Sequence, residues 1–208
     1  KRQIDTILSS YTDSVIGAAY ALSWAKRGQY FVSFTFTDRT LVFNMTTGLW
    51  HEQKSGIPNT DGDLVQGSWR VNSIVSAYGY TIVGDTEDGR LGILDTELLS
   101  EYDYDLIRLF NPPPLSNGGK PFRMPMIELT IESGVGDLTV EDPQVSMAIS
   151  EDAKTFQYER NRSMGKIGEY GRRVIWRKNG RVPRFCVLQF RISDPIKPVV
   201  IKLEADLV

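Results

Sequence analysis

Short runs of β-branched, aromatic and other apolar residues recur along almost the whole chain, and each run ends at a cluster of turn-forming residues. The run GQYFVSFTF at 28–36 alternates Tyr30, Val32, Phe34 and Phe36 with mostly smaller residues. Because successive side chains of a strand point to opposite faces, this period of two predicts β structure. Strands with an apolar face must cover that face by packing against other sheets. The sequence therefore predicts an all-β fold.

Neighbouring runs predict hairpins, because only a few polar residues separate them. One expected hairpin joins 28–36 to 39–45, and a second joins 78–85 to 90–95. The Asn-Gly pair within KNGR at 178–181 predicts another hairpin. Further β-rich runs lie at 126–133, 144–150, 172–178, 185–193 and 198–207.

An internal repeat of about 50 residues is visible in the first half of the chain. Two stretches share the same order of strand, acidic turn, strand, polar turn and aromatic residue. An alignment of the two stretches pairs Asn44 with Asp95, Val42 with Ile93 and Phe43 with Leu94. Periods of this length in an all-β chain are typical of propeller blades. Two blades cannot close a ring, so either further blades precede Lys1 or these strands pack differently. The lack of an initiating Met favours the first alternative.

Two regions are expected from this pattern. A propeller-like blade region spans 1–110, and a strand-rich, β-sandwich-like region with a basic segment spans 111–208. The length of 208 residues suffices for one good core, or for a core with a smaller second one. The best helical segment, Arg2 to Leu8, is short.

Charge is distributed unevenly along the chain. Residues 157–208 contain 12 Lys or Arg against 5 Asp or Glu, whereas 1–156 contain 12 basic and 21 acidic residues. A basic C-terminal third beside an acidic body fits a surface that faces a polyanion. The plainer interpretation is a contact between the two parts, within one chain or between subunits.

Nine basic residues form the candidate contact set for nucleic acid or for a neighbouring subunit. They are Arg160, Arg162, Lys166, Arg172, Arg173, Arg177, Lys178, Arg181 and Arg184. Strand alternation mixes charged and apolar residues on both faces, so spacing alone predicts no continuous basic stripe. No nucleic-acid module signature accompanies them.

The sequence is poor in residues that carry out chemistry. His51 is the single histidine, and no nucleophile motif accompanies it. Cys186 alternates with apolar neighbours and is expected in the core, and one Cys with one His is too few for a zinc site. Glycine-rich phosphate loops of the GxGxxG and GxxxxGK types are absent. We therefore expect no catalytic, cofactor or metal site, and no enzyme.

Two acidic turns have structural interpretations. In VGDTEDGRLGILD at 83–95, we expect Asp85, Glu87 and Asp88 at the solvated tip of a hairpin. A calcium loop would need a Glu at its twelfth position, where this chain has Thr96. In SEDAKTF at 150–156, Asp152 is expected to accept hydrogen bonds from backbone amides of a hairpin turn.

Several segments occur in an order that resembles a known family. These are 38–52, 69–95, 142–152, 164–181 and 190–201. Together they resemble the packaged-DNA stabilisation proteins of short-tailed bacteriophages, also called tail accessory or hub proteins, from about Gly28 onward. That family typically shows SxDGGxTW where this chain has SEDAKTF.

The resemblance implies a non-enzymatic virion protein assembled in the host cytoplasm, of which this chain is a C-terminal portion. Such proteins form a homo-oligomeric ring beneath the portal and its adaptor ring. They close the exit channel and carry tailspikes or fibres and a plug or needle. The basic segment would then face packaged DNA or an acidic adaptor, and no membrane is involved.

Two other functions stay open at the level of sequence. A glycan-binding or glycosidase-like β-propeller could use Trp24, Trp50 and Trp69 as stacking surfaces, although a core position is the plainer interpretation of these residues. A DNA-binding module could act through the basic segment.

Overall fold

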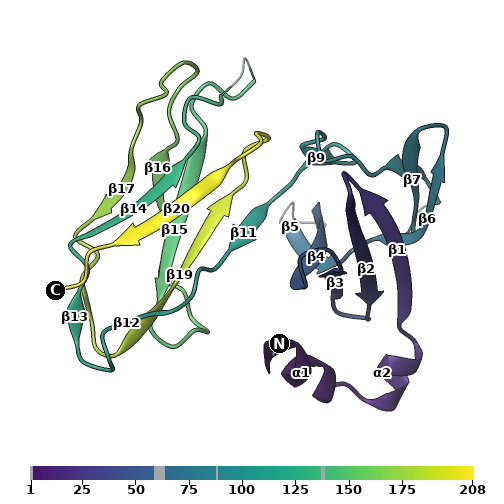
Figure 1. Cartoon of the computed structure of the whole chain (residues 1–208), viewed down its shortest axis with the longest axis horizontal. Coiled ribbons are helices and arrows are strands. Elements are labelled where there is room, and N and C mark those ends of the chain that lie inside the picture. Colours follow the sequence, from purple (N-terminus) through teal and green to yellow (C-terminus); the bar gives the residue numbers. More distant parts are fainter. Residues whose placement is uncertain (1, 59–63, 88, 137–138) are drawn as a thin grey trace. The chain divides into compact units, whose positions relative to one another are not determined.

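The computed structural model describes residues 2–58, 64–87, 89–136 and 139–208, and strands dominate it (Figure 1). Two helices near the start are α1 (Arg2–Ser9) and α2 (Asp13–Gly17). The all-β prediction and the expected first helix are confirmed, whereas the short α2 had no clear sequence signal. The chain divides into unit 1 (Lys1–Tyr104) and unit 2 (Asp105–Val208).

The first sheet of unit 1 has five antiparallel strands in chain order. They are β1 (Tyr20–Lys26), β2 (Gln29–Thr35), β3 (Thr40–Asn44), β4 (Leu49–Pro58) and β5 (Leu64–Ser68). The expected first hairpin is confirmed, because Phe34 of β2 lies opposite Leu41 of β3. Gly28 and Gly48 have positive φ at the two tight reversals that precede β2 and β4.

The second sheet of unit 1 has three antiparallel strands in the order β6–β7–β8. They are β6 (Val71–Ala77), β7 (Tyr80–Asp85) and β8 (Leu91–Ile93), followed by the pair β9 (Ser100–Glu101) and β10 (Tyr104–Asp105). The expected second hairpin is confirmed by the pairing of Ile82 with Ile93.

Trp69, Val71 and Val83 form a buried hydrophobic cluster in unit 1, and Leu22 and Trp24 of β1 pack against it. The inward side chains of β7 are Thr81, Val83 and Asp85, which alternate with outward ones as a strand requires. The cluster thus joins the first sheet to the β6–β7–β8 sheet through large side chains.

The residue-by-residue alignment of the repeat has the wrong register. Val42 is completely buried, whereas its aligned partner Ile93 is 47% exposed. Because side chains alternate between faces, a one-residue shift exchanges the inward and outward sets. Leu94, which packs against the buried cluster, is the better structural counterpart of Val42.

Unit 2 contains two main antiparallel sheets and a short strand pair. One sheet has the strand order β11–β19–β15–β16, and β12 also pairs with β19. Its strands are β11 (Arg108–Phe110), β12 (Leu115–Ser116), β15 (Gln144–Ser150), β16 (Arg160–Ser163) and β19 (Phe185–Ile192). The other has the order β17–β14–β20; these strands are β14 (Met126–Ile131), β17 (Val174–Arg177) and β20 (Val200–Ala205). The pair is β13 (Phe122–Arg123) with β18 (Arg181–Val182).

The two main sheets contribute to one core in unit 2. Trp176 and Phe190 are fully buried, with ring centroids 5.6 Å apart in an edge-to-face arrangement. Ile127, Leu129 and Leu188 join the same cluster. Burying each such side chain stabilises the fold by roughly 1.5–3 kcal/mol. This core is the scaffold on which the polar surface of unit 2 is held.

The predicted hairpin at KNGR is wrong. β17 pairs with β14 and β18 pairs with β13, so the turn between β17 and β18 carries the chain from one sheet to another strand pair. Gly180 has a positive φ there, as an Asn-Gly turn favours. The turn chemistry was recognised correctly, but the two flanking strands have different partners.

Candidate functional site

His51 lies on β4 with its ring edge-on to Phe31, at a centroid distance of 6.4 Å. Burial of the imidazole lowers the pKa of His51. No nucleophile or carboxylate of the described residues forms a hydrogen bond with this ring. Across the described ranges, no group of three His, Cys, Asp or Glu side chains lies close enough to hold a metal ion.

Cys186 is completely buried on β19, as expected for a core residue. Its Sγ lies 3.7 Å from the Sδ of Met124. Burial raises the pKa of the thiol to about 11, so the reactive thiolate is scarce at neutral pH. This cysteine is a packing residue.

The acidic turn after β7 differs from its prediction at Asp85. Its side chain is fully buried, and Oδ1 accepts hydrogen bonds from Arg70 Nη2 at 2.8 Å and from the Glu87 backbone amide at 2.7 Å. Glu87 is exposed as expected, and Asp88 lies outside the described residues. The Arg70–Asp85 ion pair therefore stabilises the start of β6 and the end of β7.

Aromatic and polar groups surround this ion pair. The Arg70 guanidinium lies 5.6 Å from the ring centroid of Tyr102. Glu101 Oε1 accepts a hydrogen bond from Ser55 Oγ at 2.5 Å, and burial raises the pKa of Glu101. Oδ2 of Asp85 and Oε2 of Glu101 are buried, and no described residue forms a hydrogen bond with either atom. The arrangement connects β4, the residue before β6, and β9.

Asp152 has the structural role expected of it. Its Oδ1 accepts hydrogen bonds from the backbone amides of Lys154 and Thr155, at 2.8 and 2.7 Å, and from Ser150 Oγ at 2.8 Å. The two backbone hydrogen bonds are the main reason that the pKa of Asp152 lies below its usual range. This carboxylate fixes the turn between β15 and β16.

The tryptophans considered for glycan stacking lie mainly in packed positions. Trp69 is buried, and Trp24 stacks on Phe31 with a centroid distance of 5.4 Å. Trp50 is partly exposed and packs on Phe43 at 4.9 Å. In the described part of unit 1, Trp50, Trp69 and Trp24 each line a different cavity.

A shallow open cavity of about 540 Å³ lies between α1 and the first sheet of unit 1. Ile4 and Ile7 of α1 line it together with Leu41, Trp50 and His51. Its walls are mostly apolar, and the polar residues that line it beside His51 are Thr6 and Glu52, the latter paired with Lys54 at 3.5 Å. The cavity offers packing surface and no reactive grouping.

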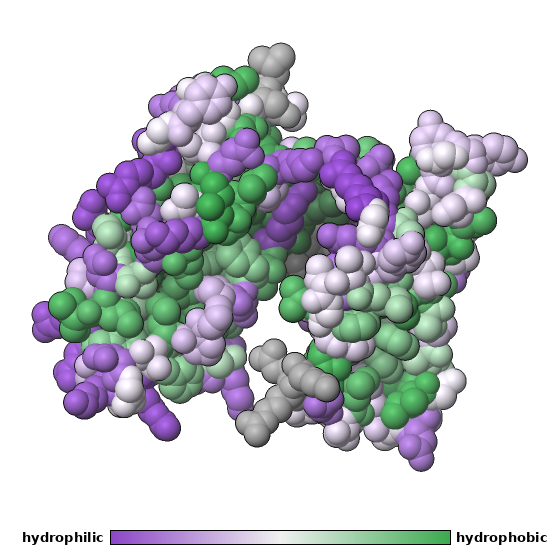
Figure 2. Space-filling model, in the orientation of Figure 1, coloured by the Kyte–Doolittle hydropathy of each residue, from purple (hydrophilic) through white to green (hydrophobic). Residues whose placement is uncertain are grey.

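The β6–β7–β8 sheet has an outward face without charged side chains. Register places eight residues on it: Ser73, Val75, Ala77, Tyr80, Ile82, Gly84, Leu91 and Ile93. Val75 is 57% exposed and Leu91 is 75% exposed. Hydrophobic side chains reach the surface in both units (Figure 2). A face of this kind is typical of a surface that another protein element covers.

The nine candidate basic residues separate into three groups. Arg160 and Arg162 on β16 are tied to the sandwich, because Arg160 Nη2 donates to Asn179 Oδ1 at 2.5 Å and Arg162 Nε donates to the Ile175 carbonyl at 2.9 Å. Burial lowers the pKa of Arg160. Both side chains therefore have internal structural partners.

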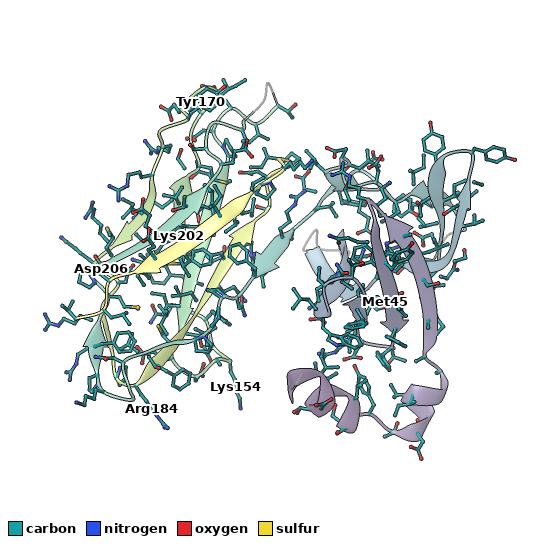
Figure 3. All side chains as sticks on the ribbon, in the orientation of Figure 1. Met45, Lys154, Tyr170, Arg184, Lys202 and Asp206 are labelled. Carbon is teal, nitrogen blue, oxygen red and sulfur yellow. The ribbon has the colours of Figure 1, made fainter. Side chains whose placement is uncertain are left out.

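The second group lies near Tyr170, at one end of unit 2 (Figure 3). Lys166 Nζ pairs with Glu141 Oε1 at 3.2 Å, and Arg173 forms a two-pronged ion pair with Glu128. Arg172 is exposed. Two of these three cations are thus already neutralised by neighbouring carboxylates.

The third group comprises Arg177, Lys178, Arg181 and Arg184, all of them exposed. Figure 3 shows Arg184 at the end of unit 2 opposite to Tyr170. Arg123 joins this group, because β13 pairs with β18 and places Arg123 directly opposite Arg181. Local sequence patterns did not indicate Arg123, because the pairing of β13 with β18 joins positions far apart in the chain.

The comparisons with known proteins agree with this architecture. The family model described as "Bacteriophage P22 Gp10, beta-propeller" matches residues 1–99, and the one described as "Bacteriophage P22 Gp10, beta-sandwich" matches residues 107–208. No curated protein sequence matches the chain. None of the described helices is long and apolar enough to cross a membrane.

The two matches follow one another along the chain in the order expected for a propeller-like region and a sandwich-like region. They confirm both the predicted fold class and the resemblance to phage stabilisation proteins. The chain therefore belongs to the bacteriophage P22 Gp10 family, whose members are structural proteins of the phage tail with a role in DNA stabilisation.

Proposed function

We propose that this chain is a structural subunit of a phage tail hub that closes the channel of the portal and its adaptor ring and so retains packaged DNA. The subunits form a homo-oligomeric ring in the host cytoplasm, and the ring provides attachment for tail fibres or spikes and for a plug or needle. The function depends on interfaces between proteins and not on catalysis.

The uncharged outward face of the β6–β7–β8 sheet carries this proposal. Its row Val75, Ile82 and Ile93 crosses all three strands without a charge. A propeller is commonly built from four to eight similar blades that cover one another's faces. We infer that another blade of the same kind covers this face, which turns the sheet into part of a closed ring.

The chemistry of the described side chains supports a structural role over an enzymatic one. No nucleophile among the described residues forms a hydrogen bond with His51, and Cys186 is buried with a raised pKa. The buried carboxylate of Asp85 and the half-buried carboxylate of Glu101 form hydrogen bonds with Arg70 and Ser55, respectively. These groups stabilise strands and turns.

A nuclease-protection experiment tests channel closure. Packaged phage heads that lack this protein are mixed with the purified protein and then treated with a deoxyribonuclease. We expect the protein to make the DNA resistant. Unprotected DNA at saturating protein would contradict the proposal.

Matched variants test the role of the sheet face in the same assay. Val75→Glu with Leu91→Glu places two charges on the outward face and is expected to abolish protection. Gln157→Glu with Ser193→Glu adds the same charge at exposed positions of unit 2 and should leave protection unchanged. Native mass spectrometry of each protein, alone and with the adaptor, should show ring formation lost only for the first pair. If both double variants protected DNA and formed rings equally well, this face would not be the surface on which the ring is built.

A further inference from the structure

Six cations gather at the end of unit 2 where β13 and β18 pair. They come from two segments, 119–125 and 177–184, and are Lys120, Arg123, Arg177, Lys178, Arg181 and Arg184. Every exposed residue of these two segments is Lys, Arg, Gly or Pro. We call this surface the cationic end. The two segments themselves contain no carboxylate and no exposed large apolar side chain. The last residues of the chain border them, because the Arg123 amide donates to the Val208 carbonyl at 2.6 Å and the Val208 amide donates to the Arg123 carbonyl at 3.0 Å.

The backbone of the cationic end is fixed by the core beneath it. Phe122 and Met124 are 1% exposed and Val182 is 2% exposed, so strand alternation directs Arg123 and Arg181 outward. The Lys178 backbone amide donates to the Pro125 carbonyl at 3.0 Å, and the Asn179 amide donates to the Met124 carbonyl at 3.1 Å. The cations are therefore presented from an ordered surface.

A charge of the same sign on directly opposite strand positions is unfavourable. Arg123 and Arg181 are such a pair, and no ion pair to an acidic side chain is found for either of them in the part of the chain that the structure describes. No ion pair is found there for Lys120, Arg177, Lys178 or Arg184 either, although Glu128, whose pKa is lowered mainly by Arg173, also interacts with Arg177. A bound anion would remove this repulsion, and guanidinium groups match phosphate oxygens well.

We propose that the cationic end binds the phosphodiester backbone of duplex DNA without reading its base sequence. Protein–DNA interfaces are rich in positive charge, whereas the centres of protein–protein interfaces are depleted of charged residues and enriched in aromatic ones. Single strands are usually held by exposed aromatic rings, which these two segments lack. The one amide side chain of the turn, Asn179, is already bound to Trp176 and Arg160.

Fluorescence anisotropy with a labelled duplex of about 30 base pairs tests this proposal across a salt series. The logarithm of the affinity falls with the logarithm of salt concentration with a slope of about −0.9 for each neutralised phosphate. Six contacts would thus weaken binding about 10³-fold between 50 and 200 mM salt. Two duplexes of unrelated sequence should bind equally well.

The decisive variant is Arg123→Gln with Arg181→Gln. We expect weaker binding at 50 mM salt and a slope that is flatter by about 2, because two phosphate contacts are removed. Arg123→Lys with Arg181→Lys keeps both charges and should keep the slope. Unchanged thermal melting of both variants shows that the fold is intact.

The control is Arg172→Gln with Lys202→Gln, which removes two exposed positive side chains elsewhere on unit 2, of which Lys202 pairs with Glu204 at 2.6 Å. Figure 3 shows Lys202 well away from Arg184. The control should change the slope little. An equal loss in the control would attribute binding to the overall charge and would overturn the proposal.

The surface could instead contact an acidic protein. Failure of the wild-type protein to bind duplex DNA at 50 mM salt, together with loss of subunit association in Arg123→Gln with Arg181→Gln, would assign it to that use and overturn the proposal. Failure of DNA binding by the cationic end would leave the proposal of channel closure untouched, because the nuclease-protection test of closure depends on the outward face of the β6–β7–β8 sheet in unit 1.

Discussion

At single positions, the main departure from the sequence prediction is a buried carboxylate. Asp85 was expected at a solvated tip because acidic residues surround it, yet it continues the inward alternation of Thr81 and Val83. The alternation of inward and outward side chains along β7 therefore already predicted an inward position for Asp85. Its partner Arg70 could not be identified from sequence, because the contact crosses from β6 to the end of β7.

Removing the charge of Asp85 should be costly. Asp85→Asn leaves the Arg70 guanidinium buried beside a neutral amide, and breaking a buried ion pair costs about 3–5 kcal/mol. We expect a fall of about 3 kcal/mol in the free energy of unfolding of unit 1, measured by urea denaturation. Asp103→Asn is the control, since this carboxylate is exposed and such surface changes stay within about 0.5 kcal/mol. Equal effects would show that the buried pair is not stabilising.

Glu101 gives a pH-dependent prediction. Burial raises its pKa in the folded chain, so the folded state holds a proton more tightly than the unfolded state does. The stability contributed by this group is therefore present below its unfolded pKa and falls as pH rises through the folded pKa. Glu101→Gln should raise the Tm at pH 7, and the gain should shrink towards pH 4. Calorimetry at both pH values checks this, with exposed Glu132→Gln as control. A gain that grows at low pH would contradict the assignment.

At the level of elements, local patterns predicted strands well and their partners only partly. The runs that became β14, β15, β17, β19 and β20 were recognised from their composition. The adjacent hairpins β2–β3 and β7–β8 were also correct, because short connections leave few alternatives. The turn at Asn179 failed as a hairpin, because the core holds β17 on β14 and β18 on β13. Long-range pairing of this kind also hid Arg123 from the candidate basic set.

The turn between β15 and β16 contains a residue with an unfavourable backbone. Ala153 has a φ of +61°, a left-handed conformation that costs a residue with a Cβ about 1–2 kcal/mol. Ala153→Gly should raise the free energy of unfolding by about 0.5–1 kcal/mol, after the larger entropy of the unfolded Gly chain is subtracted. Chemical denaturation measures the change. Ala21→Gly on β1, where φ is not positive, should instead lower it by a similar amount, and a loss in both would contradict the argument.

At the scale of the whole molecule, each unit has a core of its own. Unit 2 buries a continuous cluster that includes Trp176, Phe190 and Leu188. Unit 1 has a smaller buried cluster around Trp69 and also buries Val42 in its first sheet. The two family models match the chain as separate segments in the same order. Sequence periodicity indicated strands throughout, but it could not show how the buried side chains divide between cores, because that depends on sheet packing.

Two cores of different extent should give two unfolding transitions in calorimetry, the lower one belonging to unit 1. Leu188→Ala removes a fully buried side chain from unit 2 and should cost about 2–5 kcal/mol, which lowers the upper transition alone. Val42→Ala removes a fully buried side chain from unit 1 and should lower the other transition alone. Because each deletion leaves a cavity only in its own core, the unaffected transition serves as the internal control. A single transition that both variants lower together would mean that the units unfold as one cooperative structure.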